Sequence, residues 1–171
     1  MNMDESTVVA VGGNLGLDGA PVQAVLERAL AAMPAHGLEV VRHSGWWRSA
    51  AWPDPTQPAY LNGVALVRTR LSSREVLEAL LETEAELGRR RSTPNAPRTL
   101  DLDLIAHGRE VVDEPGLVLP HPRAADRLFV MGPLAEIAPG WRHPVSGMTA
   151  VDLAAQATVG ADARPLAAQA G

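Results

Sequence analysis

Two aspartates separated by one residue, Asp101 and Asp103, alternate with leucines along the chain. This period-two pattern predicts a β-strand with Leu100, Leu102 and Leu104 on one face and both carboxylates on the other. Residues at i and i+2 on a strand lie about 6–7 Å apart at the backbone, so both carboxylates can contact shared cations. Mg²⁺ is usually held by one or two carboxylates together with substrate phosphates. The alternative is an amphipathic strand that shows its polar face to water.

The positive charge of the chain comes entirely from arginine. The absence of lysine excludes a Schiff-base lysine and a Walker-A phosphate loop. The net charge is −5, and a concentrated arginine segment in an acidic protein favours a local anion site over a nucleic-acid surface. A metal ion with a guanidinium clamp is typical of phosphoryl transfer. The arginines in this segment are Arg89, Arg90, Arg91, Arg98, Arg109, Arg123 and Arg127.

Glu84 occupies a position in the apolar stripe of a predicted helix. A carboxylate that faces a core is costly unless it is paired or hydrogen-bonded. It therefore either forms a structural salt bridge with an arginine or lines a polar cleft and binds ligand hydroxyls. His121, between two prolines, is another possible phosphate donor together with Arg127, although a histidine beside proline is also typical of a turn.

Four of the six aromatic residues fall between positions 46 and 60: Trp46, Trp47, Trp52 and Tyr60. A flat heterocycle binds well between aromatic faces. Asn62, two residues after Tyr60 and on the same strand face, offers a donor and an acceptor to a planar amide-like edge. The alternative is that the aromatic residues fill the core.

The elements that must position these residues interleave as β-α-β-β-α-β. This is the order of a ferredoxin-like α+β sandwich with an antiparallel sheet. A capping box of Ser72 and Glu75 marks the start of the second helix, Gly88 marks its end, and Gly12-Gly-Asn14 predicts a turn after the first strand. We expect strands at 7–11, 38–43, 60–69 and 99–106, helices at 21–33 and 73–87, and long functional loops at 49–59 and 89–98.

The rest of the chain predicts a short hairpin, two helical segments and a tail. We expect the hairpin at residues 111–112 and 117–119, and helical segments at 122–126 and 128–137, with Pro133 breaking or kinking the second helical segment. We expect one domain over residues 1–171, with fraying from about residue 158.

Composition sets the remaining expectations. The chain has no cysteine, which excludes disulfides and thiol catalysis. It has no pattern of a signal peptide, and no apolar stretch of about 20 residues that would span a bilayer. We expect a cytoplasmic monomer that binds small molecules and neither nucleic acid nor membrane.

Taken together, these segments resemble the 6-hydroxymethyl-7,8-dihydropterin pyrophosphokinases, from Val11 to Pro139. The most specific motif is Pro97-Arg-Thr-Leu-Asp-Leu-Asp103. The others are Gly12-Gly-Asn-Leu-Gly16, Tyr60-Leu-Asn62, Glu84-Ala-Glu-Leu-Gly-Arg-Arg-Arg91, and Pro120-His-Pro with Arg127-Leu-Phe129. The resemblance implies ATP as co-substrate, two Mg²⁺ ions, attack of the pterin hydroxyl on the β-phosphorus, and AMP as a product.

The resemblance also implies a role for each matching residue. Asp101 and Asp103 would hold the Mg²⁺ ions, and Arg89, Arg91 and Arg98 would act on the phosphates as catalytic residues. The nucleotide would be bound by these arginines with Glu84, Leu104, His121 and Arg127. The pterin would lie between Tyr60 and Phe129, with Asn62 at its polar edge and the loop of Ser49, Ala50 and Trp52 closing over it. Both long loops would act as lids.

Two other function classes fit parts of the pattern. One is a non-catalytic ferredoxin-like ligand-binding module, with an acidic strand face and a structural Glu84–arginine pair. The other is a metal-dependent phosphohydrolase, in which the two aspartates activate water. Neither accounts for the aromatic residues, the arginines and the paired aspartates together.

Overall fold

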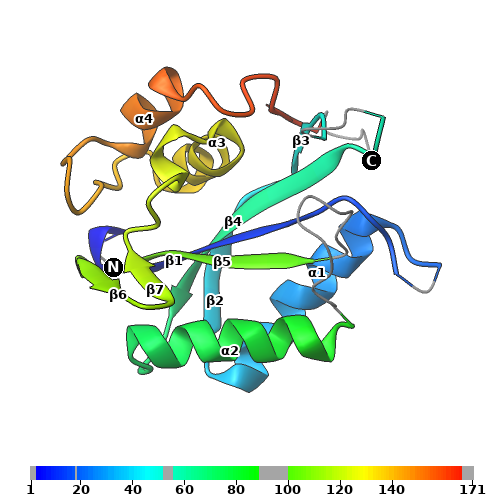
Figure 1. The fold of residues 1–171 in the computed structure, drawn as a ribbon, viewed down its shortest axis with the longest axis horizontal. Helices are drawn as coiled ribbons and strands as arrows, with labels where there is room; N and C mark the ends of the chain where they lie inside the picture. The colour runs from blue at the N-terminus through cyan, green and yellow to red at the C-terminus, as the bar shows by residue number, and fades with distance from the viewer. Residues whose placement is uncertain (1–2, 18, 52–55, 89–99, 167–171) are drawn as a thin grey trace.

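An antiparallel sheet forms the centre of the molecule (Figure 1). The computed structural model describes residues 3–17, 19–51, 56–88 and 100–166. Along the sheet the strand order is β5-β1-β4-β3-β8, and β2 also pairs with β4. The four strands β5-β1-β4-β2 give the ferredoxin-like arrangement, so the predicted fold class is confirmed. The strands are β1 (Thr7–Gly13), β2 (Glu39–His43), β3 (Trp47–Ser49), β4 (Tyr60–Arg68), β5 (Asp101–His107) and β8 (Arg164–Pro165).

Helices cover both faces of this sheet (Figure 1). Helices α1 (Val22–Ala32) and α2 (Ser73–Glu86) pack on one face, and α3 (Leu128–Ile137) and α4 (Ala150–Gln156) lie on the other. None of the helices in the described residues has the length and apolar character of a membrane span. The remaining elements are the short 3₁₀ helices η1 (Met3–Glu5), η2 (Met33–His36) and η3 (Ala124–Asp126), and the hairpin of β6 (Val112–Glu114) and β7 (Leu117–Leu119).

Each face of the sheet has its own hydrophobic core. Strand residues alternate between the faces, so Val9 and Leu102 pack toward α1 and α2, while Val8 and Leu66 pack toward α3 and α4. A register shift between Val8 and Val9 in the β1–β5 pairing accommodates one extra residue in β5. Because both faces are covered, a polar side chain in the middle of the sheet lies between the sheet and the helices on its own face.

Several boundaries differ from the sequence-based expectations. Strand β1 continues through Gly12 and Gly13, where a turn was predicted, because both glycines pair with β4. The first helix continues past Ala32 into η2, whose first turn contains Pro34, a position that tolerates proline. Pro133 lies within the helix α3. Strand β3 was not predicted at all, since its three residues are too few to show a period.

The end of the described chain is also different from the expectation. Fraying was predicted from about residue 158, but residues 158–166 make defined hydrogen bonds, and Arg164–Pro165 form β8 against β3. The alanine-rich composition was a poor guide here, because the bonds involve backbone groups and short polar side chains. Residues 167–171 lie outside the described residues.

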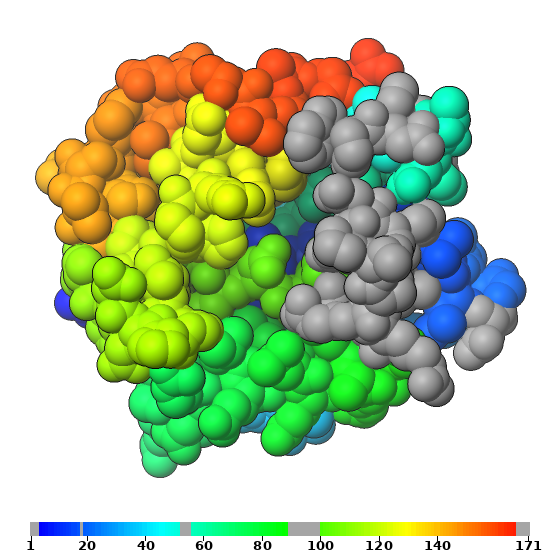
Figure 2. Space-filling model, viewed as in Figure 1, coloured from blue at the N-terminus to red at the C-terminus, as the bar shows by residue number. Residues whose placement is uncertain are grey.

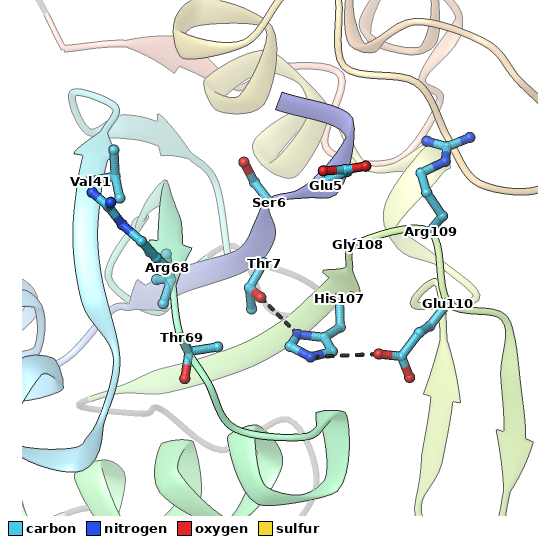
Figure 3. A pocket seen from close by; sticks show the side chains of 11 residues that line it. Glu5, Ser6, Thr7, Val41, Arg68, Thr69, His107, Gly108, Arg109 and Glu110 are labelled. Atoms are coloured by element: carbon cyan, nitrogen blue, oxygen red, sulfur yellow. Dashed lines mark hydrogen bonds and ion pairs between the residues drawn. The ribbon is translucent and has the colours of Figure 1, made fainter. Parts of the chain in front are cut away.

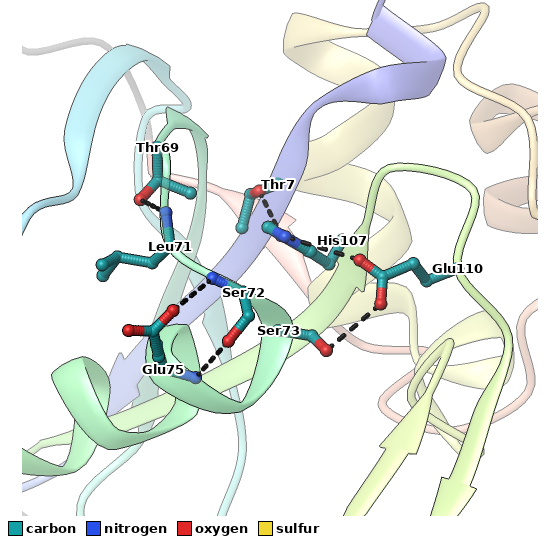
Figure 4. A network of polar contacts seen from close by, with 8 residues as sticks. All are labelled: Thr7, Thr69, Leu71, Ser72, Ser73, Glu75, His107 and Glu110. Atoms are coloured by element: carbon teal, nitrogen blue, oxygen red, sulfur yellow. Dashed lines mark hydrogen bonds and ion pairs between the residues drawn. The ribbon is translucent and has the colours of Figure 1, made fainter.

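Polar contacts anchor the start of α2 to the end of the sheet (Figure 4). The predicted capping box is confirmed: the Glu75 N–H donates to Ser72 Oγ (3.2 Å), and the Ser72 N–H donates to Glu75 Oε1 (3.0 Å). Next to it, Ser73 Oγ donates to Glu110 (3.2 Å), Glu110 pairs with His107 Nε2 (3.5 Å), and His107 Nδ1 bonds Thr7 Oγ1 (2.7 Å). The helix is thereby tied to β1 and β5.

The capping box contributes to the stability of the folded protein, and this contribution depends on pH. The backbone N–H of Ser72, and then its side chain, lower the pKa of Glu75 below its usual 4.5. A depressed folded-state pKa means that this contribution is fully present above pH 4.5 and is lost as the pH falls through the folded value. We expect Glu75→Gln to unfold at a lower temperature than the parent at pH 7, with the difference shrinking below pH 4.

Thermal unfolding between pH 3 and pH 7 measures this effect. The matched control is Glu78→Gln, which removes an exposed carboxylate from the next turn of the same helix. If the difference in unfolding temperature between Glu75→Gln and the parent is the same at every pH, the prediction is wrong.

Candidate functional site

Asp101 and Asp103 lie on the sheet face that carries α3. Asp103 pairs with Ala10 and Asp101 with Gly12 across the β1–β5 ladder, and Ala10 packs against the core beneath α3. Both aspartates are half-buried, whereas Leu102 is 5 % exposed and lies in the opposite core. The predicted alternation is therefore confirmed, and the carboxylates face a covered side of the sheet rather than open solvent.

A single row of residues crosses three strand pairs at this level. Asp101 on β5 is opposite Gly12 on β1, Gly12 is opposite Asn62 on β4, and Asn62 is opposite Trp47 on β3. Directly paired residues point to the same face of a sheet. Strands are spaced about 4.8 Å apart, so Asp101 and Asn62 are separated by about 10 Å at their backbones. The acidic pair and the predicted pterin-reading amide thus share one surface.

Gly12 is the residue that makes room in this row. A Cβ at position 12 would lie 2.3 Å from Asn62 Oδ1 and 3.3 Å from the Leu61 carbonyl oxygen. The Asn62 side chain therefore occupies the space above Gly12, and any larger residue would displace it. The sequence pattern indicated only a turn at this glycine, because the need for space beside Asn62 arises from pairing with a distant strand.

Glu84 supports the aspartate strand from the other side. Its side chain is almost fully buried on α2, at 3 % exposure, and its Oε2 accepts a hydrogen bond from the Leu102 N–H at 2.7 Å. Leu102 lies between the two aspartates, so this buried carboxylate holds the backbone that carries them. Neither of the two sequence-based interpretations of Glu84 included a backbone partner.

His121 is fixed beside β5 by its own backbone. The His121 N–H donates to the Ile105 carbonyl (2.8 Å) after a cis Leu119–Pro120 bond, and the Arg123 N–H donates to His121 Nδ1 (3.2 Å). Burial lowers the pKa of His121, Asp103 acts in the opposite direction, and Arg127 and Arg123 lower it further. The imidazole is therefore an electrostatic neighbour of Asp103 and of two arginines.

Arg127 and Phe129 bring the start of α3 to the same place. Burial lowers the pKa of Arg127, the Asp103 and Asp101 carboxylates raise it, and the neighbouring Arg123 lowers it. The Arg127 guanidinium carbon lies 5.7 Å from the Phe129 ring centroid, a cation–π contact. Figure 2 shows a recess at this position, with β1 and β5 visible at its floor between α2 and the start of α3.

Of the remaining predicted site residues, some lie on the expected sheet face, one has a buried side chain, and others lie outside the described residues. Tyr60 begins β4, opposite Ser49 and on the same strand face as Asn62. The Leu104 side chain is buried in the core beneath α1 and α2, so any contact with a nucleotide would involve its main chain. Arg89, Arg91, Arg98 and Trp52 lie outside the described residues, and the predicted lid function of the two loops remains a prediction.

The acidic pair is compatible with Mg²⁺ bound together with a phosphate-bearing substrate. Within the described residues there is no group of three or more carboxylate, imidazole or thiol side chains that would hold a metal by protein ligands alone. Two carboxylates on one strand face are, however, what Mg²⁺ uses when phosphates and water complete its coordination. The donor set therefore fits a metal that arrives with a nucleotide.

A pocket of the described residues lies elsewhere (Figure 3). It has a volume of about 760 Å³ and is lined by residues that include Thr7, Arg68 and His107. Thr7 begins β1 and His107 ends β5, whereas Gly12 and Asp101 are at the opposite ends of those strands, about 15–20 Å away. This pocket is therefore separate from the candidate site.

The sequence is similar to known proteins over most of its length. Residues 8–139 match the family model of 7,8-dihydro-6-hydroxymethylpterin-pyrophosphokinase (HPPK). A 2-amino-4-hydroxy-6-hydroxymethyldihydropteridine pyrophosphokinase from Synechocystis is 45 % identical over 150 residues, 87 % of this chain and 74 % of that protein. A folic acid synthesis protein from Pneumocystis carinii is 34 % identical over 146 residues, which cover 85 % of this chain and 19 % of that protein.

Solved structures give the same result for the fold. The wild-type HPPK-DHPS of Plasmodium falciparum superposes with a TM-score of 0.65 at 10 % identity, covering 88 % of this chain and 44 % of that protein. This chain thus spans less than half of that longer protein, and the likeness concerns the fold alone. The family match over residues 8–139 and the 45 % identity to a full-length relative show that the chain belongs to the 7,8-dihydro-6-hydroxymethylpterin-pyrophosphokinase family.

Proposed function

We propose that this protein transfers a pyrophosphoryl group from ATP to the hydroxymethyl oxygen of 6-hydroxymethyl-7,8-dihydropterin, with AMP as the second product, in folate synthesis. Family membership supports the reaction class. The observation that carries the proposal is the row from Asp101 through Gly12 to Asn62, which holds an acidic pair and an amide on one surface. A phosphate-binding half and a heterocycle-binding half are both needed for this transfer.

The nucleotide half is formed by β5, the turn at His121 and the start of α3. Asp101 and Asp103 would hold two Mg²⁺ ions, which when bound neutralise phosphate charge and polarise the phosphorus–oxygen bonds. Arg127 and His121, both next to Asp103, would donate hydrogen bonds to phosphate oxygens. Glu84 keeps the aspartate strand in place through the Leu102 N–H. Arg89, Arg91 and Arg98 would complete this half.

The pterin half is formed by β4 and α3. Asn62 offers an amide donor and acceptor to the polar edge of the heterocycle, and Gly12 leaves the space that this side chain needs. Tyr60 begins β4 on the face of Asn62, and Phe129 lies in the first turn of α3, which packs over that face. Two aromatic faces on opposite sides of a flat ring give favourable stacking. The hydroxymethyl group would then point along the row toward Asp101.

The direct test is identification of the products. Protein, Mg·ATP and 6-hydroxymethyl-7,8-dihydropterin are incubated and the nucleotides are separated by chromatography. Pyrophosphoryl transfer gives AMP and a pterin diphosphate in equal amounts. A simple kinase or a phosphohydrolase gives ADP instead, and a binding module gives no turnover, so either result would overturn the proposal.

Removal of one carboxylate from the acidic pair tests the metal-binding role. We expect Asp101→Asn and Asp103→Asn each to lower kcat by about 100-fold or more. The reason is that each variant would weaken the binding of the metal ions that stabilise the phosphate charge in the transition state. Circular dichroism and thermal unfolding check that the variants fold. The control Asp113→Asn removes an exposed aspartate on β6 and should retain the parent rate; near-parent rates for the Asp101 and Asp103 variants would contradict the assignment.

A substitution at Gly12 tests the pterin half separately. The Cβ of Gly12→Ala would displace the Asn62 amide, so we expect kcat/KM for the pterin to fall about tenfold while KM for ATP stays within about twofold. Steady-state kinetics with each substrate varied in turn gives both values. In the control Gly140→Ala the added Cβ meets no atom within 4 Å. Equal effects on both substrates would argue against this role for Asn62.

A further inference from the structure

The segment that follows α4, residues 157–166, returns across the molecule to β3. In Figure 1 it is coloured orange to red and runs from α4 past α3 toward β3. It lies beyond residues 8–139, which match the family model. Its two ends contact the two parts of the pterin half that come from distant positions in the sequence: the start of α3 and the end of β3.

The first end binds the turn that leads into α3. The Thr158 N–H donates to Asp126 Oδ1 (2.9 Å) and its hydroxyl to Asp126 Oδ2 (2.7 Å). The Val159 N–H donates to the Asp126 carbonyl (2.9 Å), and the Leu128 N–H donates to the Val159 carbonyl (2.9 Å). These bonds bracket Arg127 on both sides, so the segment holds the backbone from which Arg127 and Phe129 extend.

The middle of the segment contacts the Phe129 ring. A Cβ at Gly160 would lie 2.4 Å from Phe129 Cδ1 and 2.9 Å from Cε1. Gly160 also has a positive φ of +67°, a conformation that glycine adopts without strain. The backbone at Gly160 is therefore a wall against which one edge of the Phe129 ring rests, and no other residue would allow this approach.

The second end binds the strand that carries Ser49. Asp162 Oδ2 accepts a hydrogen bond from the Ala50 N–H at 2.7 Å. Arg164 and Pro165 pair with Arg48 and Trp47 as β8 against β3. The Leu166 N–H donates to the Trp46 carbonyl at 2.9 Å. The segment thus joins the aromatic wall on α3 to the loop that begins at Ser49.

We propose that residues 158–166 position the pterin half of the active site, with Gly160 and Asp162 as the positioning residues. Gly160 fixes the position of the Phe129 ring, and Asp162 fixes the position of the Ala50 backbone. Together they fix the distance between these two groups, between which the heterocycle would bind. This inference rests on the proposed function. It predicts a larger effect on the pterin than on ATP, because the side chain at Gly160 would meet the Phe129 ring and Asp162 binds the Ala50 N–H, whereas the segment meets the nucleotide half through the backbone around Arg127.

The first test compares two glycines with the same backbone conformation. Gly147 has a φ of +72° and no atom within 4 Å of an added Cβ, whereas at Gly160 the Cβ would overlap the Phe129 ring. Both alanine variants carry the strain of positive φ. We expect Gly160→Ala to lower kcat/KM for the pterin about tenfold, with KM for ATP within about twofold. Gly147→Ala should match the parent in both values.

The second test is independent of any strain at Gly160. Asp162→Ala removes the acceptor of the exposed Ala50 N–H bond, while Asp162→Asn keeps a carbonyl oxygen that can accept it. We expect Asp162→Ala to raise KM for the pterin about fivefold, as the loss of one hydrogen bond would, and Asp162→Asn to stay within about twofold of the parent. If Gly160→Ala does not fold, the comparison of Asp162→Ala with Asp162→Asn decides whether the segment positions the pterin half.

The outcomes separate this inference from the proposed function. A parent enzyme that makes AMP while both Gly160→Ala and Asp162→Ala retain the parent pterin kinetics overturns the inference alone. An equal rise in the KM of both substrates, or a lower unfolding temperature with both KM values unchanged, also overturns it and assigns the segment a structural role. A parent that makes no AMP overturns the proposed function, and the inference with it.

Discussion

The antiparallel pairing of β1 with β5 on one side and with β4 on the other is the constraint on which the site depends. Ladder hydrogen bonds fix which residues lie opposite each other, and here they place Asp101, Gly12 and Asn62 in one row. A shift of one residue in either pairing would turn every side chain of that strand to the other face. Two cores resist such a shift, because Leu102 would have to leave one core and Ile105 the other.

Charge is concentrated around Asp103, next to this row. Asp103 interacts electrostatically with both His121 and Arg127, and burial opposes the charged form of each of these two side chains. Such an arrangement binds a charged ligand well, since part of the desolvation has already occurred on folding. Glu84 adds a buried acceptor behind the strand, so the backbone between the aspartates is held by α2 as well as by its pairing with β1.

The site is also assembled from parts of the chain that are far apart in sequence. Phe129 packs against Gly160, and Asn62 packs against Gly12. The Ala50 N–H donates a hydrogen bond to Asp162. In two of these three pairs the supporting residue is a glycine, whose missing side chain leaves space for its neighbour. Close packing makes such absences as specific as contacts, so the two glycines help to define the positions of Asn62 and Phe129 on folding.

The sequence by itself determined the local features. Period-two alternation placed Asp101 and Asp103 on one face, the Ser72–Glu75 pair marked the start of α2, and the order of elements gave the fold class, because each of these depends on neighbours along the chain. Only the tertiary structure decided that Glu84 binds the Leu102 N–H, that Gly12 makes room for Asn62, and that residues 158–166 hold the start of α3. These contacts join residues separated by 18 to 50 positions, and no local pattern encodes them. Residues 158–166 were misjudged for the same reason: their hydrogen bonds go to distant backbone and side-chain partners, of which the alanine-rich composition carries no sign.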